Sequence, residues 1–238
     1  MEKEKKQTTK QKAIIWASIY FVLTLAIVVS SALVFHTYYY QSIFIYGNSM
    51  APTFKGGVNK DKISDFGIAD PTLKARKNLE RFDIVTCYYP WEDYEEDGIT
   101  LKKYAELKIK RLIAFPGETV SVDGENGLIS ISHGSDYLLK FNTTASEGVK
   151  ALPYKRLING ETFGRKSLDN FTLEEDEYFV MGDNWTKNGS SDCASNEQAL
   201  KFDNITAKLV AIEGTCTIDG SSGKRKCINR KYTGFKPY

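Results

Sequence analysis

Residues 46–53 read Tyr46-Gly47-Asn48-Ser49-Met50-Ala51-Pro52-Thr53, and they follow an uncharged apolar run, 13–35, by about ten residues. That run is long enough to cross the hydrocarbon core of a bilayer, which requires about 20 residues. A cleaved signal peptide has a shorter apolar region, of roughly 7–15 residues. Ser30-Ser31-Ala32 is a weak candidate cleavage site, so removal of the run is the alternative. The sequence therefore predicts a membrane anchor, with Ser49 close to a membrane face.

The lysines at the N-terminus predict the orientation of this anchor. Residues 1–12 carry five lysines and two glutamates, a local charge of +3 in a chain whose formal net charge is +2. By the positive-inside rule, a cytoplasmic tail at 1–12 and a transmembrane helix at 13–36 precede an extracytoplasmic domain at 37–238. That domain is nearly neutral, which gives no electrostatic reason to expect nucleic-acid binding.

Beyond the anchor, the sequence predicts mainly β structure. Short apolar or alternating runs are separated by Gly, Pro, Asn and Asp, which is the pattern of strands joined by turns. These runs are 42–46, 83–89, 108–115, 119–122, 128–131, 178–181 and 207–213. The segment 61–80 is expected to form a short helix or a loop.

The predicted strands divide into a core and an insertion. The expected parts are the first part of a β core at 37–131, a polar inserted subdomain at 132–177, and the second part of the core with a C-terminal hairpin at 178–238. Cys216 and Cys227 would lie opposite each other in this hairpin, where a disulfide and two free thiols are equal alternatives. The sequence predicts no metal site and no cofactor.

The chain offers few candidates for a catalytic base. Its two histidines, His36 and His133, lie in contexts that do not suggest a base. A serine nucleophile could instead use a lysine, because burial in an apolar site lowers the lysine pKa. Residues alternate along a strand, so Lys110 would share an apolar face with Leu112 and Ala114. An exposed strand lysine is the simpler interpretation of Lys110 alone, and the neighbouring motifs favour the buried one.

Four motifs in order after one anchor resemble those of bacterial type I signal peptidases of the short form. They are Ser49-Met50-Ala51-Pro52-Thr53, Arg81-Phe82-Asp83-Ile84-Val85, Lys110-Arg111 with Pro116-Gly117-Glu118, and Gly182-Asp183-Asn184 with Ser190 and Asp192. The resemblance implies a membrane-anchored serine endopeptidase that removes signal peptides from exported preproteins after Ala-x-Ala motifs. It also implies an antiparallel β catalytic core with a small inserted subdomain.

The resemblance implies the catalytic roles as well. Ser49 would be the nucleophile and Lys110 the general base. Ser190 would hydrogen-bond the lysine amine and orient it. The last motif is two residues longer than usual here, so Ser191 is an alternative to Ser190.

Three supporting residues follow from the same resemblance. Asp183 would pair with Arg111 and tie the last motif to the lysine strand, and Asp192 would give structural support. Position 194 is alanine where the family usually has arginine. Either Lys187 replaces that arginine as the partner of Asp192, or Asp192 is exposed and needs no partner.

The expected substrate-binding residues surround the two catalytic ones. Apolar side chains before the nucleophile and before the lysine would form shallow pockets for small residues of the substrate. The residues in this group are Phe44, Ile45, Gly47, Met50 and Ile109. Gly47 stands where some members of the family have a serine that helps to hold the oxyanion, so the Ser49 amide would have to serve.

Two other functions compete with this prediction. Val85-Thr86-Cys87 resembles the nucleophile of a sortase-like cysteine transpeptidase, although the histidines are poorly placed for one. The unusual last motif also fits a catalytically impaired anchored protein that binds exported chains. The favoured interpretation has preproteins and membrane lipid at the catalytic face as partners, and a monomer is expected.

Overall fold

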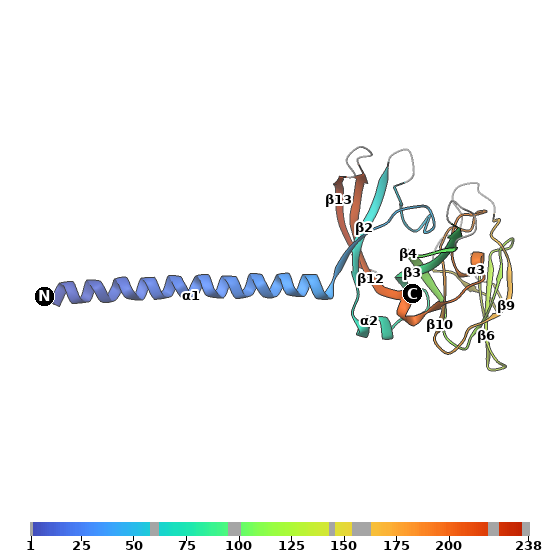
Figure 1. Cartoon of the computed structure of the whole chain (residues 1–238), viewed down its shortest axis with the longest axis horizontal. Helices are drawn as coiled ribbons and strands as arrows, with labels where there is room; N and C mark the ends of the chain where they lie inside the picture. The colour runs from blue at the N-terminus through green and yellow to red at the C-terminus, as the bar shows by residue number, and fades with distance from the viewer. Residues whose placement is uncertain are drawn as a thin grey trace. The chain divides into compact units, whose positions relative to one another are not determined.

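The computed structural model describes residues 2–57, 62–94, 101–142, 146–153, 163–218 and 224–234. The chain divides into two compact units, 1–41 and 42–238. The first unit consists almost entirely of helix α1, Glu2–Tyr39 (Figure 1). Its segment Gln11–Phe35 has a mean hydropathy of 2.3 and no buried residues, so it is long and apolar enough to cross a membrane.

Three hydroxyl side chains of the apolar segment are hydrogen-bonded to the backbone of the helix itself. The hydroxyls of Ser18 and Thr24 donate to the carbonyls one turn earlier, at 3.0 and 2.8 Å, and Ser31 donates to Val28 at 2.9 Å. A hydroxyl that is bonded to its own helix presents no unpaired donor to hydrocarbon. The helix is therefore chemically suited to lipid over its apolar length.

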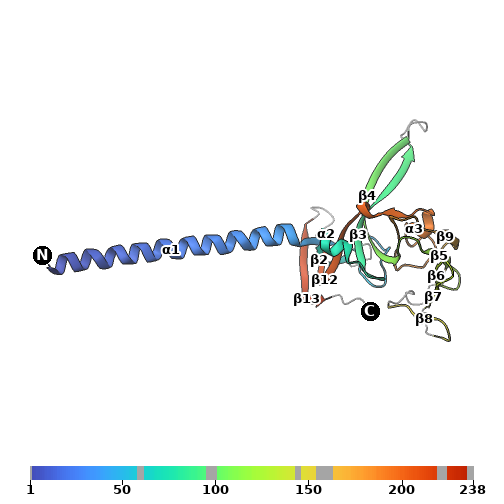
Figure 2. The ribbon, with the colours of Figure 1, turned by 90° about the horizontal axis from the view of Figure 1, so that it is seen from below.

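The second unit contains two mostly antiparallel sheets (Figures 1 and 2). The larger sheet has the order β1-β2-β12-β3-β4-β10-β11, with β13 paired to β12. Its strands are β1 (Gln41–Phe44), β2 (Ile63–Asp70), β3 (Ile84–Tyr94), β4 (Leu101–Ala114), β10 (Glu177–Met181), β11 (Leu200–Lys201), β12 (Ile205–Ile218) and β13 (Arg225–Gly234). The mainly antiparallel β fold expected from the sequence is confirmed.

The smaller sheet has the order β8-β7-β6-β5-β9. Its strands are β5 (Thr119–Asp123), β6 (Leu128–His133), β7 (Tyr137–Asn142), β8 (Lys150–Ala151) and β9 (Leu168–Thr172). The hairpin β5–β6, assigned from the sequence to the core, pairs with β7 and β9, so the second sheet begins at Thr119. Three short helical segments complete the fold: α2 (Leu73–Lys77), α3 (Cys193–Asn196) and the 3-10 turn η1 (Phe202–Asn204).

Alternating burial explains how these strands form a core. In β5 and β6 every second residue is buried, with Val120, Val122, Ile129 and Ile131 at most 1% exposed. They pack in one large apolar cluster with side chains of the larger sheet, including Phe179. Burial of each such side chain contributes about 1.5–3 kcal/mol. The shared cluster holds the two sheets together and fixes the ends of β4 and β10.

The segment expected to be a helix or a loop contains a strand. Residues 63–70 form β2, which pairs with β12 along its whole length, and only the short helix α2 follows. At the far end of β12, Cys216 is in register with Cys227 of β13, and both thiols are free in the structure. The turn between them, 219–223, lies outside the described residues, and the disulfide stays a prediction.

Candidate functional site

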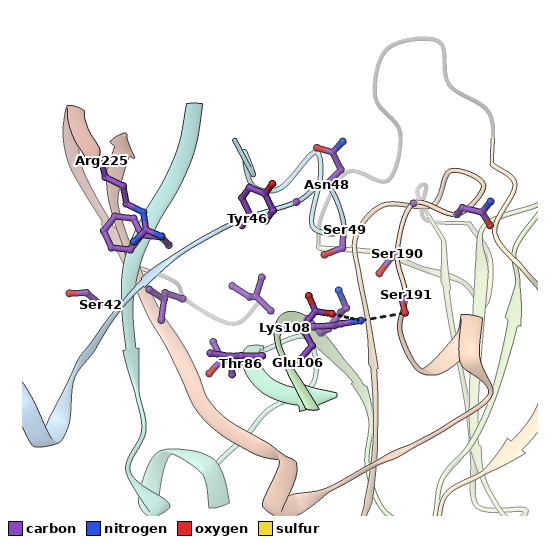
Figure 3. A pocket seen from close by; sticks show the side chains of 18 residues that line it. Ser42, Tyr46, Asn48, Ser49, Thr86, Glu106, Lys108, Ser190, Ser191 and Arg225 are labelled. Carbon is purple, nitrogen blue, oxygen red and sulfur yellow. Dashed lines mark hydrogen bonds and ion pairs between the residues drawn. The ribbon is translucent and has the colours of Figure 1, made fainter. Parts of the chain in front are cut away.

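One cavity gathers three of the sequence motifs. It has a volume of about 720 Å³ and is lined by most of 42–49, all of 106–110 and all of 188–191, with Thr86 and Arg225 (Figure 3). Ser49, Lys110, Ser190 and Ser191 all belong to this lining. Segments that are far apart in the sequence thus bring a hydroxyl and an amine into the same hollow.

Ser49 lies in a compact turn that is fastened at both ends. The amide of Gly47 donates to the carbonyl of Gly56 at 2.9 Å, and the amide of Phe54 donates to the carbonyl of Met50 at 3.0 Å. Gly47 has a φ of +87°, which favours glycine. The chain therefore reverses direction at Gly47 and presents Ser49 to the cavity.

The predicted substrate-binding residues separate into two groups. Phe44, Gly47 and Ile109 line the cavity, as expected. Ile45 and Met50, at 2% and 1% exposure, are instead buried in a small apolar cluster with other core residues. Alternation explains the difference for Ile45, since its neighbours on either side face the cavity. Ile45 and Met50 hold the turn in place from behind.

Lys110 is the most unusual residue of the cavity because it is almost fully buried, at 2% exposure. It lies on β4, opposite Val85 of β3. Burial lowers the pKa of Lys110 below its ordinary value of 10.5, because desolvation penalises the ammonium form. The attraction of Asp192 opposes this shift, and the nearby positive charge of Lys108 adds to it. The site therefore favours a neutral amine, which can accept a proton.

The loop from Gly182 to Asp192 packs directly on the Ser49 turn. The amide of Asn184 donates to the carbonyl of Ser49 at 3.0 Å, and its side chain donates to the carbonyl of Asn48 at 3.1 Å. A Cβ atom at Gly182 would lie 2.3 Å from both the Ser49 carbonyl oxygen and the Ser190 Oγ. Only a residue without a side chain fits between these two groups.

The two candidate serines have different surroundings. Ser191 Oγ accepts from Lys108 Nζ at 3.4 Å, as Figure 3 shows, and from the Asn196 side chain at 3.2 Å. Ser190 is 8% exposed, and its buried Oγ lies near the Asp192 carboxylate but makes no hydrogen bond of good geometry to any residue that the structure describes. Ser190 Oγ is thus the hydroxyl that remains available to a group in the cavity.

Arg111 and Asp183 form a buried, bidentate ion pair. Arg111 Nε and Nη2 donate to Asp183 Oδ1 and Oδ2 at 2.8 and 2.6 Å. Asp183 Oδ2 also accepts from Thr53 Oγ1 at 2.5 Å. The carboxylate therefore joins β4, the loop after β10 and the end of the Ser49 turn. The sequence assigned no role to Thr53.

The remaining guanidinium nitrogen of Arg111 binds a residue whose backbone is strained. Arg111 Nη1 donates to the carbonyl of Phe82 at 2.9 Å, and Phe82 has a φ of +73°. A positive φ of this kind costs residues other than glycine about 1–3 kcal/mol. The Phe82 ring is buried against Phe141, edge to face at 4.9 Å. Packing and the arginine contact together stabilise a backbone that glycine would adopt freely.

Asp192 has a partner that neither sequence alternative named. It is fully buried and forms an ion pair with Arg165, from the segment between β8 and β9. Lys187, the partner in one of the two alternatives, is exposed, and the exposed Asp192 of the other alternative is not found either. Burial alone would raise the Asp192 pKa, but the Arg165 charge and further hydrogen bonds hold it below its ordinary value. No local signal could have found Arg165, because it lies 27 residues before Asp192.

Cys87 lacks the properties of a nucleophile. It is fully buried in the large apolar cluster and does not line the cavity. Burial raises the pKa of its thiol to about 12, although Lys110 and Lys108 oppose the shift. A cysteine nucleophile needs an accessible thiolate. The surroundings of Cys87 therefore give no support to a sortase-like reaction.

Two comparisons with known proteins agree on the family that this chain resembles. The family model described as "Signal peptidase, peptidase S26" matches residues 16–212. The chain is 26% identical over 184 residues to the protein named Signal peptidase I P of Bacillus subtilis subsp. natto, covering 77% of this chain and 80% of that relative. Strand β13 and its Arg225, whose guanidinium lies 3.7 Å from the centre of the Phe44 ring, come after the matched residues.

Proposed function

Because the chain belongs to the S26 signal peptidase family, we propose that it removes signal peptides from exported preproteins as a Ser49/Lys110 serine endopeptidase. The observation that carries the proposal is that Lys110 is buried and lines the same cavity as Ser49. A peptidase that relies on serine needs a base, and a desolvated lysine is neutral enough to be one. Ser190 and the Arg111–Asp183 pair support the site in the proposal.

The reaction follows from these positions. Ser49 Oγ attacks the carbonyl carbon of the scissile bond and gives its proton to Lys110 Nζ. The tetrahedral intermediate collapses when Lys110 returns that proton to the leaving amine, which releases the mature chain. Lys110 then takes a proton from water, and the hydroxide attacks the acyl-enzyme. Lys110 returns that proton to Ser49 Oγ as the ester bond breaks, which frees the signal peptide and restores both residues. The Ser49 backbone amide is the proposed donor to the oxyanion.

The walls of the cavity support a preference for small residues before the cleaved bond. Phe44 and Ile109 supply apolar surface close to Ser49, and the charged end of Arg225 covers the Phe44 ring. These walls would form the shallow apolar pockets for small residues of the substrate. We propose cleavage after Ala-x-Ala, with a monomer anchored through 13–36, its N-terminus in the cytoplasm, and lipid at its catalytic face.

Cleavage of a defined preprotein tests this function. The full-length protein in lipid vesicles is given a preprotein whose signal peptide ends in Ala-x-Ala, and the new N-terminus is sequenced. We expect a cut directly after the second alanine. A matched substrate with leucine in place of that alanine should stay uncut. Equal cleavage by the Ser49→Ala variant would disprove the proposed nucleophile.

The proposed base predicts the pH dependence of cleavage. Only neutral Lys110 can accept the Ser49 proton, so kcat/KM should rise with pH as Lys110 loses its proton. The midpoint should lie below the ordinary lysine pKa of 10.5, because burial lowers the Lys110 pKa. His133→Ala is the control, since His133 is exposed and stacks on Tyr137 away from the cavity lining. An ascending limb that disappears in His133→Ala would contradict the lysine base.

A further inference from the structure

The buried ion pair of Arg165 and Asp192 lies directly behind the site. The two side chains are 3% and 0% exposed, and Arg165 comes from outside every motif that resembles the family. Ala194, where that family usually has arginine, is itself fully buried. We propose that Arg165 is the positioning residue that replaces this arginine and, through Asp192, holds Ser190 in the cavity that Lys110 lines. The inference rests on the proposed function.

The contacts of the pair converge on Gly182. Arg165 Nη1 donates to the carbonyls of Gly182 and Asn184 at 3.1 and 3.3 Å. Asp192 Oδ2, which contacts Arg165 Nη2, also accepts from the amide of Gly182 at 2.8 Å. One ion pair therefore fixes both the amide and the carbonyl of Gly182. Since Gly182 is wedged between the Ser49 carbonyl and Ser190 Oγ, the pair sets where Ser190 lies.

The other oxygen of Asp192 fixes the residues that follow Ser190. Oδ1 accepts from the amides of Ala194 and Ser195 at 3.2 and 3.4 Å and so caps helix α3. The Arg165 guanidinium lies over the fully buried ring of Trp185, 5.4 Å from its centre. Ser190 is thus held on both sides by backbone that depends on Asp192, and Asp192 depends on Arg165.

The pair also acts on Lys110 through its charges. Desolvation lowers the Lys110 pKa, Asp192 and Cys87 oppose this shift, and Lys108 and Arg165 add to it. With Arg165 present, the attraction of Asp192 for an ammonium group is partly cancelled. Removal of the Arg165 charge leaves that attraction unbalanced, so Lys110 would hold its proton to a higher pH. A purely structural residue would not produce this change.

The shape of the guanidinium separates its two roles. Its nitrogens contact the carboxylate and two carbonyls at once in a fixed plane, whereas a lysine ammonium is a single point charge. Arg165→Lys keeps the charge and loses this bridging. Arg165→Met loses both. The two variants therefore distinguish the effect on position from the effect on the Lys110 proton.

The experiment measures kcat and KM against pH for the full-length protein and its variants. We expect Arg165→Met to lower kcat about 10²-fold, which is the effect of a misplacement of about 1 Å at the site. The same variant should move the ascending limb of the pH profile to higher pH. Arg165→Lys should lower kcat but leave the ascending limb of the pH profile at the wild-type pH. Lys166→Met is the matched control, because this neighbouring cation is 55% exposed and pairs with Glu197 at the surface. Lys166→Met should keep the wild-type kcat and the wild-type position of the ascending limb of the pH profile.

A double variant separates the charges from the fold. In Arg165→Met with Asp192→Asn both charges are absent. Because Asp192 acts on the Lys110 pKa more strongly than Arg165 does, the ascending limb should return to the wild-type pH or to a lower pH. The loss of kcat should be smaller than the two single losses combined. Thermal melting checks that each variant folds. If Arg165→Met does not fold, Arg165→Lys and the double variant decide the outcome.

Two results would overturn the inference. Wild-type kcat in folded Arg165→Met or in Arg165→Lys would show that Arg165 positions nothing. An ascending limb that stays at the wild-type pH in folded Arg165→Met, or that stays above the wild-type pH in the double variant, would exclude the effect on Lys110. Failure of the proposed function is distinguishable, because cleavage would then survive Lys110→Met, and the inference would fall with it. If Lys110→Met is inactive while Arg165→Met is normal, only the inference fails.

Discussion

Replacement of Lys110 with methionine is expected to reduce preprotein cleavage by about 10³-fold or more, while the protein stays folded. The loss combines the contribution of a general base, about 10²–10⁴-fold, with the cooperation of nucleophile and base as one unit. Methionine has a similar length and needs no desolvation of an amine. The substitution should therefore leave the packing of β4 intact. Single-turnover cleavage of a preprotein at fixed pH measures the effect.

Stability provides an independent check of the same variant. Because burial lowers the Lys110 pKa, unfolded chains bind a proton at Lys110 that folded chains do not, so the contribution of Lys110 to wild-type stability should rise with pH towards 10.5. Lys110→Met should lack that part of the rise in denaturant unfolding. Lys201→Met is the control, since Lys201 is 61% exposed and pairs loosely with Asp176 at 3.6 Å. Full cleavage activity in Lys110→Met would end the proposal of a lysine base.

Gly182→Ala should have the second largest effect, because the new methyl group has no room. Its Cβ would lie 2.3 Å from the Ser49 carbonyl oxygen and from Ser190 Oγ, and one of these groups must move. Overpacking of this kind typically costs about 1–3 kcal/mol of stability. A shift of about 1 Å at the nucleophile or at its support typically costs about 10²-fold in rate. We expect both losses, measured by thermal unfolding and by kcat.

Gly164→Ala is the matched control for this substitution. A Cβ at Gly164 would come no closer than 3.3 Å to any atom, and its nearest neighbour is the exposed side chain of Lys187. Neither glycine has a positive φ, so the comparison isolates the available space from backbone preference. If Gly182→Ala retained wild-type kcat, the close packing of the last loop on the Ser49 turn would be irrelevant to catalysis.

Periodicity in the sequence predicted the parts of the fold that depend on local order. Most of the expected strands exist, and alternation along 108–115 correctly predicted an apolar face around Lys110. Strand β2 was missed, because Gly67 and two aspartates interrupt its pattern. The structure shows why glycine stands there: a Cβ at Gly67 would lie 2.2 Å from the carbonyl oxygen of Ala211 on β12. Pairing with β12 outweighs the weak local preference for a strand.

For the candidate site, too, the sequence predicted some features and only the structure provided the others. The motifs predicted Ser49, Lys110 and the last loop as candidate site residues, and the structure brings them to one cavity. The expected contact of Arg111 with Asp183 is present. The choice between Ser190 and Ser191 needed the structure, because it depends on where Lys108 and Asn196 reach. These two side chains engage Ser191 from other elements, and the sequence of the loop does not encode their positions.

The amino-acid sequence by itself determined the apolar helix, the mainly antiparallel β class and the order of the motifs, because hydrophobic periodicity and turn residues act over a few neighbouring positions. Only the tertiary structure decided the partner of Asp192 and the removal of Ile45 and Met50 from the cavity wall. A buried carboxylate takes whichever cation the fold brings within hydrogen-bonding distance. Here the packing of Trp185 against the segment of Arg165 brings that cation from 27 residues away, which no spacing in the sequence could indicate.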